Sequence, residues 1–343
     1  MTSNSAASIN GKENSLQAQT PAAELSTLLA GDMDNVNALI ISEMQSDVAL
    51  IPKLAGYLIA AGGKRVRPLL TLASASLFSK NIESSYGLAA AVEFIHTATL
   101  LHDDVVDGSE ERRGQKAANL IFGNDTSVLV GDFLFSRAFQ LMVKSGSIDV
   151  LRILSNASAV IAEGEVLQLQ TQGDLSTNAQ TYYKVIAAKT AELFAAACEI
   201  GPVIAGKQEH AAAMRSYGYN LGMAFQIADD VLDYQGNSKD LGKNTGDDFH
   251  DHKVTLPVIL AFEEGTEDEK EFWHRCFEKE DIHKGDLEHA YNLIQKYDTC
   301  SKALQIARNF SSEAKEALTT IETDTSILKT LENLPDYLVS RSS

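Results

Sequence analysis

Two clusters of aspartates hold the residues in this chain that are most able to do chemistry. Both have the form Asp-Asp-x-x-Asp, and both end a long apolar run. Their members are Asp103, Asp104 and Asp107 in the first cluster, and Asp229, Asp230 and Asp233 in the second. Residues four apart share a face of a helix, so the outer aspartates of each cluster crowd like charges together unless a cation neutralises them. Carboxylate oxygens suit Mg²⁺ that substrate phosphates also bind. We therefore predict that the two clusters face each other as a cage for a diphosphate and several magnesium ions.

Basic residues stand in two further motifs. Gly62-Gly63-Lys64-Arg65-Val66-Arg67-Pro68 places three cations in a tight loop at the start of a helix. Helix N-termini favour anions, and the arginine fork fits phosphate oxygens, so this loop is a candidate phosphate site; a solvated basic turn is the alternative. Arg112-Arg113-Gly114 closely follows the first acidic cluster, where a plain salt bridge is the alternative to substrate binding.

Other candidates are single residues within apolar or glycine-rich segments. Lys189-Thr190 interrupts a helix of mostly Ala, Leu and Phe, and Lys243 and Lys253 bracket a glycine-rich segment after the second cluster. His96 precedes the first cluster by two helical turns. Taken alone, each lysine is typical of a surface residue and the histidine of a structural one.

Apolar residues recur at helical spacing from about Ala22 onward, and no alternating strand pattern of useful length is present. No proline lies between Pro68 and Pro202, which favours long helices. We predict a disordered tail over residues 1–21 and one all-α domain over 22–343, a bundle of long helices around a deep central cavity. Residues 107–114 and 236–253 are expected to be loops, and the segment after about residue 267 to form peripheral helices. The main expected helices are 52–61, 68–78, 86–104, 127–143, 148–170, 178–200, 209–234 and 255–263.

Composition limits the possible partners and compartments. The formal net charge is −18, which argues against nucleic acid as a partner and against tight binding to anionic lipid. Cys198, Cys276 and Cys300 have no metal-binding spacing and are typical of thiols in a reducing compartment. No apolar segment is long and pure enough to predict a transmembrane span, and no secretory signal is evident, so we expect a cytoplasmic protein.

The motifs together are more specific than any of them alone. The order Gly-Gly-Lys-Arg-x-Arg-Pro, Asp-Asp-x-x-Asp with Arg-Arg-Gly, Lys-Thr, Phe-Gln-x-x-Asp-Asp-x-x-Asp and Leu-Gly-Lys resembles that of the trans-isoprenyl diphosphate synthases, from about Gly62 to Pro257. The run Glu-Phe-Ile-His-Thr-Ala-Thr-Leu-Leu-His over 93–102 resembles the long-chain branch, which makes polyprenyl tails of respiratory quinones. The resemblance implies a Mg²⁺-dependent prenyltransferase that adds isopentenyl diphosphate to an allylic primer such as farnesyl or geranyl diphosphate. The product would be of octaprenyl to decaprenyl length.

The resemblance also implies a role for each motif residue. Isopentenyl diphosphate would be bound by Lys64, Arg67, His96 and Arg113. Three magnesium ions per site would be held by Asp103, Asp107 and Asp229, together with Asp104, Asp230 and Asp233. The allylic diphosphate would be held by Arg112, Lys189, Thr190, Gln226, Lys243 and Lys253. The catalytic residues would be Asp103, Asp104, Asp107, Arg112, Lys189, Asp229 and Lys243.

Product length would depend on the residues just before the first cluster, where the growing chain leaves the diphosphate. Ala98 and Thr99 are both small and predict a long product, and a deeper floor is a candidate role for Phe133, Phe135, Phe139 or Met142. One departure from the family pattern is visible: His252 precedes Lys253 where the family usually has glycine.

Three further expectations concern alternatives and assembly. A terpene cyclase shares the first cluster but usually lacks the second, and a non-catalytic partner subunit typically loses aspartates from one cluster. The family usually forms homodimers, and the apolar helix over 86–101 is wide enough to face a partner as well as the core. The protein is also expected to associate loosely with membranes for product release.

Overall fold

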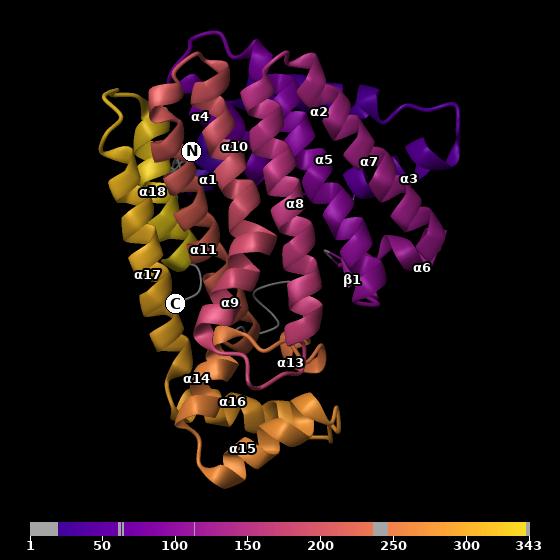
Figure 1. Cartoon of the computed structure of the whole chain (residues 1–343), viewed down its shortest axis with the longest axis vertical. Helices are drawn as coiled ribbons and strands as arrows, with labels where there is room; N and C mark the ends of the chain where they lie inside the picture. Colours follow the sequence, from indigo (N-terminus) through magenta and orange to yellow (C-terminus); the bar gives the residue numbers. More distant parts are fainter. Residues whose placement is uncertain (1–19, 61–62, 64, 113, 236–245, 341–343) are drawn as a thin grey trace, which may run out of the picture.

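The computed structural model describes residues 20–60, 63, 65–112, 114–235 and 246–340. Within these ranges the chain is almost entirely helical, and long helices lie side by side with a smaller group of short helices at one end (Figure 1). The prediction of an all-α bundle is confirmed. Most of the predicted tail lies outside the described residues, and the first helix begins at Pro21, one residue before the predicted boundary.

The described helices of the first half lie between Pro21 and Thr171. They are α1 (Pro21–Leu28), α2 (Ala30–Glu43), α3 (Leu50–Ala60), α4 (Val66–Ser76), α5 (Glu83–Val106), α6 (Ala118–Phe122), α7 (Asn124–Lys144) and α8 (Ile148–Thr171). Those of the second half are α9 (Ala179–Ile186), α10 (Glu192–Ile204), α11 (Ala211–Gln235), α13 (Asp247–His250), α14 (Leu256–Glu264), α15 (Glu267–Trp273), α16 (Asp286–Lys296), α17 (Thr299–Leu318) and α18 (Ser326–Ser340). The described residues also contain three short irregular turns: a 3-10 turn at Gln208–His210 and π-turns at Ala187–Ala191 and His274–Glu278.

The two acidic clusters lie at the C-terminal ends of two long core helices. Asp103 and Asp104 occupy the last turn of α5, Asp107 follows as its C-cap, and the second cluster occupies the last turns of α11. The C-terminal end of a helix carries partial negative charge from its unpaired carbonyl groups. Carboxylates placed there repel the helix end as well as one another, so both sites favour a cation.

A π-turn interrupts the helix that was predicted over 178–200. It spans Ala187–Ala191 and holds Lys189 and Thr190. Two glycines let neighbouring helices approach this turn closely: a Cβ added at Gly164 of α8 would lie 2.5 Å from the Ala188 Cβ, and one at Gly222 of α11 would lie 2.6 Å from the Ala191 Cα. The turn is therefore held between α8 and α11, and its side chains are presented from a tightly packed base.

Two buried clusters of apolar side chains form the core. The larger joins α2, α4, α5, α7, α8 and α10, and the smaller joins α11, α14, α16 and α17 with the short helices at the lower end of Figure 1. Helix α17 lies in the segment predicted to form peripheral helices, and it exposes a polar face that includes Lys302, Arg308 and Glu313. This helix packs along α11 and buries one apolar face that includes Ala303, Leu304 and Ala307.

Two local features differ from the predicted loops and helix starts. Residues Glu111–Arg112 and Gln115–Lys116 pair as a short antiparallel hairpin, β1 and β2, within the segment after the first cluster. Helix α4 begins at Val66 rather than Pro68, because Arg65 stands before it in the left-handed region with φ 47°.

By length and composition α7 is apolar enough to cross a membrane, although it lies along α5 here, so the predicted absence of such a helix is not confirmed.

Candidate active site

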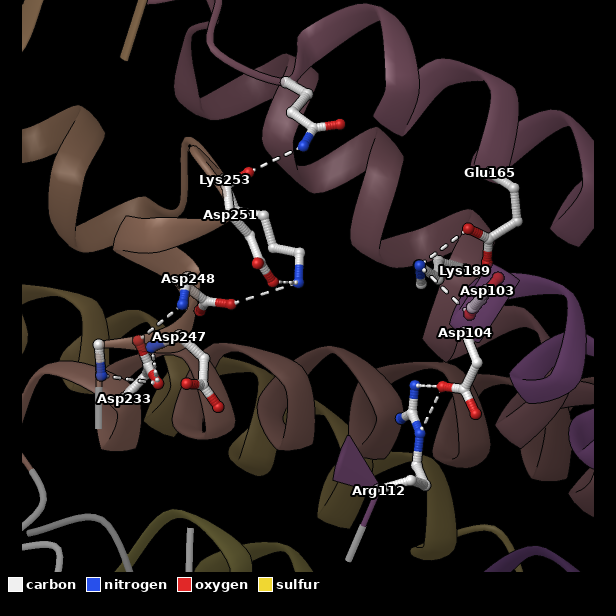
Figure 2. Close-up of polar contacts among 12 residues, drawn as sticks. Asp103, Asp104, Arg112, Glu165, Lys189, Asp233, Asp247, Asp248, Asp251 and Lys253 are labelled. Atoms are coloured by element: carbon white, nitrogen blue, oxygen red, sulfur yellow. Dashed lines mark hydrogen bonds and ion pairs between the residues drawn. The ribbon is translucent and has the colours of Figure 1, made fainter. Parts of the chain in front are cut away.

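Lys189 lies between the first acidic cluster and helix α8. Its Nζ donates to the Glu165 Oε2 at 2.8 Å and lies 3.4 Å from the Asp103 Oδ2 (Figure 2). Beside it, the Arg112 guanidinium from β1 donates to the Asp104 carboxylate, with 2.8 Å between Nε and Oδ1. The structure therefore brings Asp103, Asp104, Arg112 and Lys189 together, and their roles in binding substrate stay predictions.

A chain of hydrogen bonds runs from the π-turn to the second cluster. The Thr190 hydroxyl donates to the Gln226 Oε1 at 2.7 Å, and the Gln226 Nε2 donates to the Asp230 Oδ1 at 2.8 Å. The Tyr182 hydroxyl donates to the other oxygen of Asp230 at 2.5 Å. Because Lys189 and Thr190 are neighbours, one network of contacts joins the two acidic clusters across the bundle.

The second cluster is completed by the segment that begins at Gly246. Three backbone N–H groups, from Gly246, Asp247 and Asp248, donate to the Asp233 carboxylate at 3.1–3.3 Å. Lys253 lies 2.8 Å from the Asp251 carboxylate and 3.8 Å from that of Asp248. In Figure 2, Lys253 and Asp248 lie on the same side of the site as Asp233.

Burial of like charges dominates the electrostatics of the site. Burial raises the pKa of Asp230 to about 7, although Tyr182 and Gln226 lower it, and burial raises the pKa of Glu165 to about 7 against the opposing effect of Lys189. Burial also raises the pKa of Asp248, and the nearby Asp230 raises it further. For Lys189, burial lowers the pKa but the adjacent Asp103 and Glu165 outweigh it, so the lysine stays charged. A partly buried excess of negative charge is unstable by itself and favours binding of cations.

The acidic side chains do not form a complete metal site as they stand. Among the described residues, no group of three or more acidic, histidine or cysteine side chains already converges to hold an ion. Three of the carboxylates already accept hydrogen bonds: Asp104 from Arg112, Asp230 from Tyr182 and Gln226, and Asp233 from backbone N–H groups. The donor set still fits Mg²⁺, because it consists of hard carboxylate oxygens held at two helix ends with like charges crowded together. The assignment of these aspartates as ligands stays a prediction.

Two arginines of the basic motif, Arg65 just before α4 and Arg67 in its first turn, contact the core. Arg65 forms an ion pair with the buried Glu93 of α5, and the Arg67 guanidinium lies 4.6 Å from the centre of the Phe194 ring. A guanidinium above a ring gains cation–π attraction while its donors stay directed to one side. Arg67 is thus positioned, as is the half-buried His96 on α5, but their binding of isopentenyl diphosphate stays a prediction. Lys64, Arg113 and Lys243 lie outside the described residues.

The residues predicted to govern product length differ in their exposure. Ala98 is completely buried, and the half-buried Thr99 donates its hydroxyl to the His96 carbonyl oxygen. Phe139 is 41% exposed, so it does not close a tunnel within one chain, whereas Met142 is completely buried.

The departure at His252 has a local explanation. This residue has φ 55°, a left-handed conformation that glycine adopts without strain and that other residues adopt at a cost. Its carbonyl oxygen accepts a hydrogen bond from the Gly173 N–H at 2.9 Å, which fixes the segment before Lys253. Histidine therefore occupies the backbone conformation for which the family uses glycine.

Three residues of the site were not predicted from the sequence. Glu165, Tyr182 and Asp248 come from α8, α9 and α13, and none belongs to a motif that was singled out. The only sequence signal for Asp248 was its place in Gly-Asp-Asp-Phe-His-Asp, a second acidic run between two lysines. Tyr182 and Glu165 carried no signal, because their partners lie on other helices.

Comparison with known proteins agrees with this arrangement. A family profile described as polyprenyl synthetase matches residues 48–294. The chain belongs to the polyprenyl synthetase family. It is 41% identical over 301 residues to the octaprenyl diphosphate synthase of Escherichia coli K12, an alignment covering 87% of this chain and 92% of the relative. A decaprenyl diphosphate synthase structure from Rhodobacter capsulatus matches with a TM-score of 0.90 at 50% identity, covering 94% of this chain and all of that one.

A second similar structure contains bound ligands. This is a polyprenyl synthase from Caulobacter crescentus CB15 complexed with calcium and isoprenyl diphosphate, with a TM-score of 0.90 and 51% identity, covering 95% of this chain and 99% of that one. The predicted family, the prenyltransferase class and the synthesis of long-chain polyprenyl diphosphates are confirmed. Family membership also favours this enzyme class over the terpene cyclase that shares the first acidic motif.

Proposed function

We propose that this chain extends an allylic diphosphate, farnesyl or geranyl diphosphate, with successive units from isopentenyl diphosphate. The product would be an all-trans chain of octaprenyl to decaprenyl length that serves as a quinone side chain. One observation carries this proposal: Lys189 and Thr190 on the π-turn join an acidic cluster at the end of α5 to another at the end of α11. Cationic and acidic groups that alternate in this way fit a diphosphate bound with divalent ions.

We assign Mg²⁺ to Asp103, Asp107 and Asp229, together with Asp104, Asp230 and Asp233, as the family resemblance implies. Hydrogen bonds from Arg112, Gln226 and backbone N–H groups fix the carboxylates of Asp104, Asp230 and Asp233. Bound Mg²⁺ would supply positive charge where the leaving diphosphate develops negative charge. Family members depend on Mg²⁺ in general, and a relative with 51% identity is described with calcium, another hard divalent ion.

The residues of the chain perform the remaining steps of the proposed reaction. The allylic carbon–oxygen bond breaks, its electron pair leaves with the diphosphate, and Arg112, Lys189 and Lys253 stabilise the negative charge. The double bond of isopentenyl diphosphate then attacks the allylic cation and forms the new carbon–carbon bond. A proton leaves the adjacent carbon, and the released diphosphate accepts it. Buried apolar side chains of α5, including Ala98 and Leu101, exclude water from the cation.

A direct assay tests this proposal. The purified chain, supplied with farnesyl diphosphate, isopentenyl diphosphate and Mg²⁺, is expected to form a long polyprenyl diphosphate that mass analysis identifies. Asp103→Ala and Asp229→Ala should each lower turnover by orders of magnitude while the fold persists by circular dichroism. Asp34→Ala on the exposed surface of α2 is the control and should keep full activity. A chain that makes only cyclic products, or that is active only with a second protein, would refute the proposal.

We also propose that two copies of the chain form a dimer through α6, α7 and α8. The predicted partner surface on α5 is already covered, since most of that helix is buried against its neighbours. Exposed apolar side chains gather instead on the next helices: Leu120, Ile121, Val128, Leu129, Phe139, Val143, Val166 and Leu169. A groove of about 520 Å³ beside Ala162, Val166 and Leu167 continues this surface.

Large exposed apolar patches mark interaction sites, and a second copy would bury these side chains. Light scattering should give a dimer mass, and Leu129→Lys, at a side chain 66% exposed here, should give a monomer. A wild-type monomer at micromolar concentration would contradict this assembly. We place the enzyme in the cytoplasm, with loose membrane contact during product release.

A further inference from the structure

Glu165 lies in the site but belongs to neither acidic cluster. It follows Gly164 on α8, and its side chain is 26% exposed. Its carboxylate points at Lys189, which is 25% exposed and comes from the π-turn (Figure 2). The pair therefore joins two elements that are far apart in the sequence, and it faces the end of α5 where the first acidic cluster stands.

Lys189 has two carboxylates within reach, and they are not equivalent. The Nζ lies 2.8 Å from the Glu165 Oε2, within hydrogen-bonding distance, and 3.4 Å from the Asp103 Oδ2. Glu165 is thus the partner that fixes the ammonium group. If Asp103 holds Mg²⁺, its negative charge is shared with that ion and attracts the lysine less, whereas Glu165 is left to hold it.

The backbone beneath this pair is unusually close-packed. Gly164 allows α8 to approach the π-turn so closely that an added Cβ would lie 3.1 Å from the Lys189 amide nitrogen. A lysine side chain has four rotatable bonds, and a free one must be ordered each time it binds an anion. A neighbouring carboxylate on a close-packed helix removes that requirement, because the cation is already in place.

We propose that Glu165 is a positioning residue, which holds the Lys189 ammonium toward the allylic diphosphate. The inference rests on the proposed function, and it adds a residue from α8 to the motif residues of α5, α11 and the π-turn. Glu165 itself carries negative charge and would repel a diphosphate, so its contribution must pass through Lys189. It follows that binding of the allylic diphosphate depends on Glu165, whereas binding of isopentenyl diphosphate at the basic loop does not.

Steady-state kinetics with both substrates separate these two effects. Glu165→Ala is expected to raise KM for farnesyl diphosphate about 10- to 100-fold, the loss of one charge-assisted hydrogen bond, with KM for isopentenyl diphosphate unchanged. Glu165→Gln keeps an oxygen acceptor for Lys189 and should show a smaller rise. Titration calorimetry with inorganic diphosphate and Mg²⁺ should show the same order of affinities without turnover.

Glu199→Ala is the matched control. It removes a glutamate that pairs with Arg215 at 3.0 Å on α10 and α11, outside the site, so both KM values should stay at the wild-type level. Equal rises in both KM values for Glu165→Ala, or a fall in kcat alone, would overturn the inference. Unchanged binding of diphosphate in both Glu165 variants would do the same. A wild-type chain that forms no prenyl product would instead count against the proposed function, and the calorimetry would still test the Glu165–Lys189 pair.

Discussion

Gly164→Ala is the substitution that most directly tests how the fold positions Lys189. The new Cβ would lie 2.5 Å from the Ala188 Cβ, whereas carbon atoms in contact normally lie about 3.5–4.0 Å apart. Helix α8 and the π-turn must therefore separate by about 1 Å. The new Cβ would meet the Ala188 Cβ and the Lys189 backbone nitrogen, and neither atom is the end of a flexible side chain that could move aside. The Lys189–Glu165 hydrogen bond spans these two elements at 2.8 Å and would be stretched beyond hydrogen-bonding distance.

The expected effect on catalysis is larger than the effect on stability. A charge-assisted hydrogen bond contributes about 1.5–3 kcal/mol, so kcat/KM for the allylic substrate should fall by roughly 10- to 100-fold. Overpacking costs about 1–3 kcal/mol, but replacing a helical glycine with alanine returns about 1 kcal/mol, so the net loss of folding free energy is at most about 2 kcal/mol. Chemical denaturation and steady-state kinetics on one preparation measure both quantities.

Gly31→Ala on α2 provides the control for the glycine substitution itself. No atom lies within 4 Å of a Cβ added there, so this variant should gain up to about 1 kcal/mol in stability and keep its kinetics. If Gly164→Ala folds and keeps wild-type kcat/KM for the allylic diphosphate, then close packing of α8 on the π-turn does not position Lys189, and the reasoning fails.

Three other substitutions, one of them with a control at the neighbouring residue, test separate parts of the structure. Ala98→Phe places a large ring at a completely buried position of α5 and should shorten the product by one or more isoprene units, read by chromatography; an unchanged long product rejects the tunnel assignment. Tyr182→Phe removes the donor to Asp230 and should cost about 1–3 kcal/mol in urea unfolding. Tyr183→Phe, its neighbour, should cost less than half of that. Asp286→Asn should cost roughly 2 kcal/mol at pH 7, because hydrogen bonds from Arg275 lower the pKa of Asp286 to about 2. A lowered folded-state pKa stabilises the fold at pH values above the pKa of the unfolded state, and this stabilisation is lost as pH falls. The unfolding free energies of mutant and wild type should therefore converge near pH 2.

The sequence was sufficient to predict the helices that carry the acidic clusters, because this signal is local. The apolar run of α5 and the Phe-Gln-x-x-Asp-Asp-x-x-Asp run of α11 have helical periodicity over many residues, and both motifs fall at the helix ends. Their order along the chain indicated the family. The packing of α17 along α11 was not predicted, since the apolar face of an amphipathic helix does not indicate which helix it contacts.

The parts of the site that were missed depend on contacts between distant segments. Nothing in the sequence around Glu165 indicates that Lys189, on another helix, lies within hydrogen-bonding distance. The π-turn was also hidden, because Ala187–Ala191 contains residues that favour an ordinary α-helix. The turn packs closely against α8 at Gly164 and against α11 at Gly222, and helix propensity does not record such packing.

The π-turn explains how two acidic clusters on separate helices act on one ligand. In a regular helix over 178–200, the directions of successive side chains would differ by about 100°. That geometry alone would not direct Lys189 to α5 and the adjacent Thr190 to α11. The extra residue in the turn widens the backbone locally, as often occurs at functional sites. Lys189 then reaches Glu165 and Asp103, while Thr190 reaches Gln226 and, through it, Asp230. A shift of the turn would disturb both clusters together, so substitutions at Gly164 and Gly222 should impair the same kinetic step although they lie on different helices.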